Sequence, residues 1–155
     1  MNKIIILCAF FACTMSSAIL ACPNLSANYA RCVSSSGDNS NSENIVVSQK
    51  RENDMVIYSI KSKDIQSGEE ETKVMIADGK TRKIEEKDPE TGLAYTQYET
   101  YTCMDQSIVG KVNLIIDNEL LLDVTITTKK IGKRMISEIK GKSMNTIIDD
   151  TIICE

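Results

Sequence analysis

The chain alternates apolar and polar residues over most of its length, in short runs that are separated by turn residues. A period of two places successive side chains on opposite faces of a β-strand, and several such runs indicate a sandwich or a barrel. The clearest run has one apolar face, formed by Leu120, Leu122, Val124 and Ile126. The pattern predicts strands at 25–32, 45–49, 55–61, 73–77, 81–85, 94–103, 108–116, 120–130, 133–140 and 146–154.

Three turn signals join these predicted strands into hairpins. Asp78-Gly79 and Gly132-Lys133 supply a glycine for positive backbone angles, and Asp117-Asn118 separates two strongly apolar strands. Strands joined by tight turns run antiparallel. We therefore predict an all-β fold, an antiparallel meander of about eight or nine strands that forms a small barrel or a strongly curved sheet.

The first 21 residues have the pattern of an export signal. Lys3 precedes the apolar run 4–12, and small residues then lead to Ala21. This order is typical of a secretory signal peptide, and the apolar run is shorter than the roughly 20 residues of a membrane-spanning helix. We predict cleavage after Ala21, with Ala18 as the alternative site. The remainder, 22–155, is then one exported β domain, periplasmic or secreted, with a polar loop at 34–44.

The cysteines predict that this domain is disulfide-stapled. Of six cysteines, Cys8 and Cys13 leave with the signal peptide. An even number of cysteines in an oxidising compartment indicates two disulfides, and the domain contains no Phe or Trp to strengthen its core. The four that remain are Cys22, Cys32, Cys103 and Cys154. Three pairings are open, and we favour bridges that tie the two ends of the chain to its middle.

A lipid anchor is the alternative role for Cys22. The sequence Ile19-Leu20-Ala21-Cys22 resembles the lipobox of bacterial lipoproteins, in which the cysteine is acylated and becomes the new N-terminus. Leu20 occupies a position where that box usually has a small residue, and acylation would leave three cysteines, an odd number. The sequence therefore favours the disulfide, and the alternative localisation is attachment to the envelope.

Composition argues against most kinds of enzyme. The chain has no histidine, so it cannot build a Ser-His or Cys-His nucleophile pair or a His-ligated metal site. Its paired carboxylates, 69–71, 85–86 and 149–150, are adjacent in sequence, and neighbours in a strand point to opposite faces. The net charge of −4 gives no general attraction to nucleic acid. We expect no catalytic residues, metal or cofactor.

Two groups of residues are candidates for binding. Tyr95 and Tyr101 share one face of a predicted strand, and with Tyr58 they form either part of the core or one wall of a ligand cavity. The stretch 129–142 is basic, and it either protects a sheet edge or contacts an anionic partner. The residues of that candidate contact are Lys129, Lys130, Lys133 and Arg134.

The short first strand with Asn28, Tyr29 and Cys32, the polar loop and the meander together resemble small exported bacterial β proteins of lipocalin-like (calycin) architecture. The Gly-x-Trp signature of lipocalins is missing, so no ligand residues carry over. The resemblance implies a binding module for a small hydrophobic ligand or lipid. The alternative function is a structural or interaction protein of the envelope or secretome, with a filled core and the basic contact surface at 129–142.

Overall fold

The computed structural model describes residues 22–37, 42–53, 55–64, 67–88 and 91–155. The predicted signal peptide, its cleavage sites and part of the polar loop lie outside these residues. The described residues form ten strands: β1 (Ala27–Ser34), β2 (Ser42–Glu52), β3 (Met55–Asp64), β4 (Glu70–Ala77), β5 (Arg82–Lys87), β6 (Ala94–Met104), β7 (Ser107–Ile116), β8 (Glu119–Ile131), β9 (Arg134–Ser143) and β10 (Thr146–Cys154).

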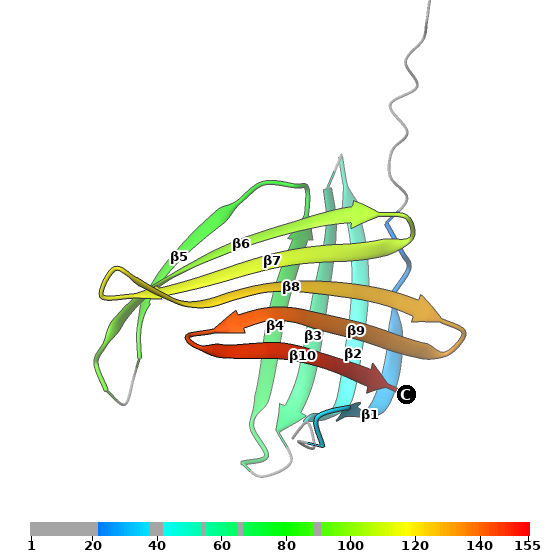
Figure 1. Ribbon diagram of the computed structural model, residues 1–155. Helices are drawn as coiled ribbons and strands as arrows, with labels where there is room; N and C mark the ends of the chain where they lie inside the picture. The colour runs from blue at the N-terminus through cyan, green and yellow to red at the C-terminus, as the bar shows by residue number, and fades with distance from the viewer. Residues whose placement is uncertain (1–21, 38–41, 54, 65–66, 89–90) are drawn as a thin grey trace, which may run out of the picture.

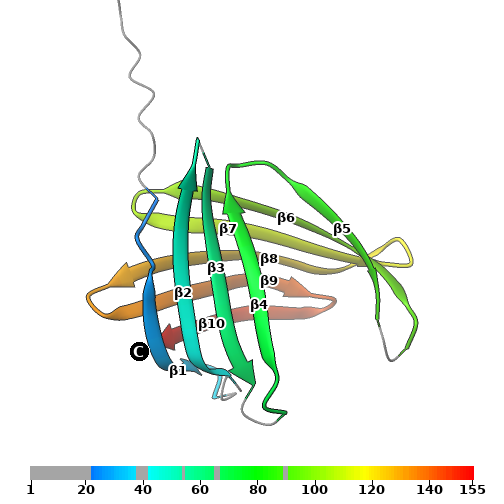
Figure 2. The same cartoon turned by 180° about the vertical axis from the view of Figure 1, so that it is seen from behind.

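The strands form a closed barrel. Their order is β4-β3-β2-β1-β10-β9-β8-β7-β6-β5, and β4 also pairs with β6, so nine strands complete the ring and β5 is an extra strand beside β6. Neighbours are antiparallel except at the β4–β6 contact, a single parallel pair between Ala77 and Tyr101. In Figures 1 and 2, β6 to β10 cross β2 to β4 at a steep angle. This confirms the all-β prediction. Of the two predicted forms, a barrel or a strongly curved sheet, the strands form the barrel.

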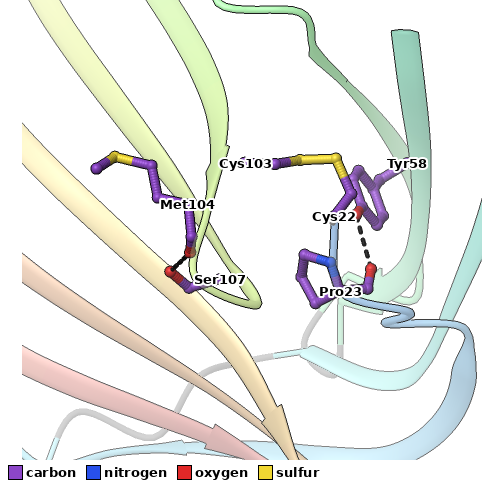
Figure 3. Close-up of a disulfide and its surroundings, with 6 residues drawn as sticks. All are labelled: Cys22, Pro23, Tyr58, Cys103, Met104 and Ser107. Carbon is purple, nitrogen blue, oxygen red and sulfur yellow. Dashed lines mark hydrogen bonds between the residues drawn. A yellow bond between two sulfur atoms is a disulfide. The ribbon is translucent and has the colours of Figure 1, made fainter. Parts of the chain in front are cut away.

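One end of the barrel is filled by the segment before β1. The Tyr58 hydroxyl on β3 donates a hydrogen bond of 2.7 Å to the carbonyl oxygen of Pro23. Leu25 is fully buried, and its carbonyl oxygen accepts a hydrogen bond of 3.1 Å from the Tyr29 hydroxyl. A disulfide joins Cys22 to Cys103 at the end of β6 (Figure 3). Burial raises the pKa of Tyr58 to about 12. We call this end, to the right in Figure 1, the closed end.

The second disulfide corrects the predicted pairing. Cys22–Cys103 joins an end of the chain to its middle, as expected, whereas Cys154 is bonded to Cys32 of β1. The reason is the barrel itself, because closure brings the first and last strands side by side over 32–34 and 152–154. Two disulfides, as predicted, therefore link the described cysteines.

The turn at Asp78-Gly79 is not the predicted hairpin. β4 and β5 do not pair with each other, and both pair with the same edge of β6, β4 at Tyr101 and β5 at 94–99, so the chain reverses along that edge. Gly79 has φ of 72° and donates its backbone N–H to the carbonyl oxygen of Tyr101 at 2.9 Å. The Arg82 guanidinium binds both carboxylate oxygens of Asp78, at 2.8 and 3.0 Å, and holds the pKa of Asp78 below its usual range. A local sequence signal could not reveal this arrangement.

The turns at 117–118 and 132–133 form the predicted hairpins, but Leu120 does not lie on the predicted face of its strand. Asp117 and Asn118 both have positive φ, as a two-residue hairpin of that type requires. A bulge at Leu121 shifts the β7–β8 register, so Leu114 pairs with Leu122 but Ile115 pairs with Leu120. Leu120 therefore leaves the apolar face of 122–126 and is 53% exposed.

Asp150 of β10 ties down the end of β1. Its carboxylate accepts hydrogen bonds from the hydroxyls of Ser34 and Ser35, at 2.7 and 2.8 Å, and from the backbone N–H of Ser36 and Thr151. These bonds favour the ionised form and lower the pKa of Asp150 to about 2.

We expect Asp150→Asn to make the stability of the protein depend less strongly on pH in the acid range. Because the folded pKa lies below the unfolded value of about 4, Asp150 stabilises the protein above that pH, and the contribution is lost as pH falls toward about 2. Melting temperatures measured across this window should fall less steeply in the variant than in the wild type. The control is Asp149→Asn, an exposed neighbour outside this network. Equal slopes for Asp150→Asn and the wild type would contradict the prediction.

Candidate functional site

A groove of about 460 Å³ opens at the end of the barrel opposite the closed end. It lies on the inward face of β6 and β7, beside the loop that joins β5 to β6, toward the left of Figure 1. We call it the mouth groove. Its walls are mainly apolar, and its lining residues are Asp88, Thr91, Leu93, Tyr95, Gln97, Leu114 and Ile116.

The alternation of side chains along β6 and β7 determines which residues form the floor of the mouth groove. In β6 every second residue from Tyr95 to Cys103 faces inward, and the antiparallel register sets Tyr95 opposite Ile116 and Gln97 opposite Leu114. These four side chains are only partly buried, whereas inward-facing residues nearer the closed end, such as Ile108, are fully buried. The inward apolar face therefore continues past the packed core into the groove.

The loop between β5 and β6 forms the outer wall. The Asp88 carboxylate accepts hydrogen bonds from the backbone N–H and hydroxyl of Thr91, at 2.6 and 2.7 Å, and the Asp88 backbone N–H donates to the carbonyl oxygen of Leu93 at 2.8 Å. These bonds hold Leu93, which is 47% exposed, beside the groove. The Tyr95 hydroxyl donates to the Glu86 carboxylate of β5, which fixes the ring at the rim.

Beyond Gln97, the inward face of β6 continues with two buried polar residues outside the groove lining, Glu99 and Tyr101. The Glu99 side chain is only 8% exposed, and its carboxylate accepts a hydrogen bond from the Gln97 amide. The ammonium nitrogen of Lys73 on β4 lies 3.7 Å from the same carboxylate, longer than a direct charged hydrogen bond.

The Tyr101 ring packs over the backbone of β7. A Cβ atom added to Gly110 would lie 2.7 Å from the ring, so only glycine leaves room for it. The Tyr101 hydroxyl is buried and has no hydrogen-bond partner among the described residues. Burial and the neighbouring Glu99 carboxylate raise the pKa of Tyr101. The phenol therefore stays protonated at physiological pH and can donate a hydrogen bond.

The three candidate tyrosines lie in different surroundings. Tyr58 and Tyr101 both belong to the buried hydrophobic core, whereas Tyr95 lines the mouth groove. Sequence reasoning did not single out Gln97 or Glu99. The available signal was their alternation with Tyr95 and Tyr101, which places a carboxylate and an amide on the inward face.

The basic residues of 129–142 do not form one uniform surface. Lys129 and Lys130 extend from opposite faces of β8, and the Lys130 ammonium donates to the carbonyl oxygen of Ser26 at 2.9 Å. Lys129 forms an ion pair with Glu138 at 3.0 Å, and Arg134 forms one with Glu155 at 3.1 Å. Lys133 lies exposed in the β8–β9 turn. Nearby acids thus neutralise part of this charge.

Within the described ranges, no three Cys, Asp or Glu side chains come together as metal ligands. No helix in the described part of the chain is long and apolar enough to cross a membrane. Comparison of the chain with protein-family models, with curated proteins and with solved structures found no match.

Proposed function

We propose that this protein is an exported, non-enzymatic binding module that holds a small apolar molecule in the mouth groove. The observation that carries the proposal is the half-buried apolar face of β6 and β7, where a filled core would have fully buried side chains. The volume of about 460 Å³ falls within the roughly 300–1,000 Å³ of small-molecule sites. Apolar walls with a few polar groups at one end are also typical of such sites.

The disulfides support the exported location. Two bridges in one small domain are consistent with an oxidising compartment, because thiols are kept reduced in the cytosol. The Cys22 sulfur is bonded to Cys103, and a sulfur in a disulfide cannot carry a lipid. The arrangement therefore favours a protein without an anchor at Cys22.

We expect Ile116→Trp to abolish most of the binding, because a larger ring from β7 would fill the mouth groove. An apolar dye that fluoresces on leaving water should bind the oxidised wild-type protein, and the variant should bind it at least about tenfold more weakly. Leu120→Trp is the matched control, since it adds the same ring to an exposed position at the start of β8.

Native mass spectrometry of protein from its own host provides an independent measurement. A retained adduct of lipid or similar mass is expected for the wild type and should be lost in Ile116→Trp. A wild-type protein that repeatedly lacks an adduct and binds no dye would refute the proposed function. Equal binding by both tryptophan variants would show that the groove is not the site.

A further inference from the structure

The apolar inward face of the barrel continues beyond the mouth groove onto β8, β9 and β10. Leu122 of β8 pairs directly with Leu114, which lines the groove. Val124, two residues further along β8, is buried, and it pairs with Gly141 of β9, which in turn pairs with Ile148 of β10. Residues that pair across neighbouring strands point to the same face of a sheet, as do alternate residues of one strand. Leu122 and Ile148 therefore both point into the barrel.

These inward side chains are only partly buried. Leu114, Leu122 and Ile148 keep part of their surface exposed and lie outside the buried hydrophobic core cluster of the described residues. Figure 2 shows the reason, because the right-hand ends of β6, β7 and β8 extend past β4, the last strand of the opposite wall. Together with Gly141 and Ser143, which face the same way, they form what we call the inner strip. Water reaches this strip, so covering it with an apolar group is favourable.

The side chains of the inner strip favour a narrow, uncharged ligand. On β9 the strip has no side chain at Gly141 and only a small one at Ser143, so the least side-chain volume stands in its middle. All its residues are uncharged, whereas the outward positions beside it include the exposed Asp123 and Lys142, which pair with each other. A charged group laid on this strip would exchange water for mostly apolar contacts, which is costly, whereas an alkyl chain would gain from the same exchange.

The mouth groove and the inner strip together are long. They extend from β6 to β10, which is four strand spacings, or about 19 Å at roughly 4.8 Å each. The groove residues on β6 and β7 cover only the first of these spacings. We propose that the protein binds a long, unbranched alkyl chain, such as the acyl chain of a lipid, from the mouth groove across the inner strip to Ile148. This inference rests on the proposed function, because it names the ligand class of a site that includes the same groove.

The first experiment varies the length of the chain. Octyl, decyl, dodecyl and tetradecyl maltosides share one neutral head group, and each is titrated below its critical micelle concentration against the oxidised protein loaded with the apolar dye. Because burying one CH2 group strengthens binding about fourfold, the affinity should rise by about that factor for each added carbon, up to tetradecyl. A site confined to the mouth groove would give no further rise once the chain had filled it.

The second experiment tests the far end of the strip. In Ile148→Gln, tetradecyl maltoside should bind at least about tenfold more weakly, and octyl maltoside should bind within about twofold of the wild type, because a short chain does not reach β10. Ile147→Gln is the matched control, since it is the same substitution at an outward neighbour that is 77% exposed. Ser143→Asp puts a charge in the middle of the strip and should also weaken tetradecyl more than octyl binding. Thermal melting of each variant confirms that it is folded.

The outcomes separate this inference from the proposed function. If the dye binds but the affinity stops rising beyond octyl, or if Ile148→Gln and Ile147→Gln bind tetradecyl maltoside equally, the extended site is wrong and the apolar groove stands. Equal losses for octyl and tetradecyl in Ile148→Gln would also contradict it, because the substitution would then act without contacting the end of the chain. If neither the dye nor any maltoside binds, both proposals fail.

Discussion

Replacing Cys32 and Cys154 together by Ser is expected to lower the free energy of unfolding by about 4–5 kcal/mol. The bridge closes a loop across a sequence separation of 122, and in the chain-entropy account such a long loop constrains the unfolded chain strongly. It also secures one of the shortest strand pairings in the barrel, three residue pairs between β1 and β10. For a domain of this size, the melting temperature should fall by about 15 °C or more.

The matched control removes the other bridge, with Cys22 and Cys103 both changed to Ser. Its loop, with a separation of 81, contributes nearly as much by the entropic account, so this variant should also melt early. Hydrogen exchange distinguishes the two variants. Amides of β1 and β10 should lose protection when Cys32 and Cys154 are replaced, and amides near 22–25 when the other bridge is removed. Four alkylated thiols in the non-reduced wild type would contradict both bridges.

The second large effect is expected for Gly141→Ala on β9. Here the backbones of β8 and β9 approach so closely that an added Cβ atom would lie 2.0 Å from the carbonyl oxygen of Asp123. Real Cβ contacts are never this short, and the obstacle is backbone, so the two strands must separate. We expect a loss of about 2–4 kcal/mol in chemical denaturation, the range of severe overpacking.

Gly132→Ala in the β8–β9 turn is the control for this substitution. Gly132 has φ of 60°, and a Cβ atom there would meet nothing within 4 Å. Only the cost of a left-handed backbone remains, about 1 kcal/mol. A smaller loss for Gly141→Ala than for Gly132→Ala would show that strand contact at Gly141 does not limit stability.

Local sequence patterns predicted the strands well, because alternation and turn residues involve only residues that are close in sequence. The period of two and the turn at Asp117-Asn118 placed the hairpins of β6 to β10 within a few residues of their observed bounds. Cysteine parity likewise predicted two bridges. The chain reversal at Asp78-Gly79 was missed because it depends on contacts with Tyr101, more than twenty residues away. The exposed position of Leu120 was missed because it depends on a bulge.

The site was harder to predict than the strands. A tyrosine on the inward face fits either a core or a cavity, and only the position along β6 separates Tyr101 in the core from Tyr95 in the groove. Glu99 looks like an ordinary surface residue in a charged strand, because its burial depends on β5 and β7, which pair with β6 on either side of it. The side-chain alternation of β6 shows which of its residues share a face. It identifies the interior residues only once the inward face is known.

The closed end has a kinetic consequence if the mouth groove binds a ligand as we propose. Pro23, Leu25 and the Cys22–Cys103 bridge fill one end, so a bound molecule must leave by the route through which it entered. A substitution at the rim that does not touch the bound molecule then changes the barrier equally in both directions. Association and dissociation rates should move by the same factor, and Kd should stay constant. For a residue such as Leu93, a change in Kd would identify direct contact, whereas a change in rates alone would identify a gate.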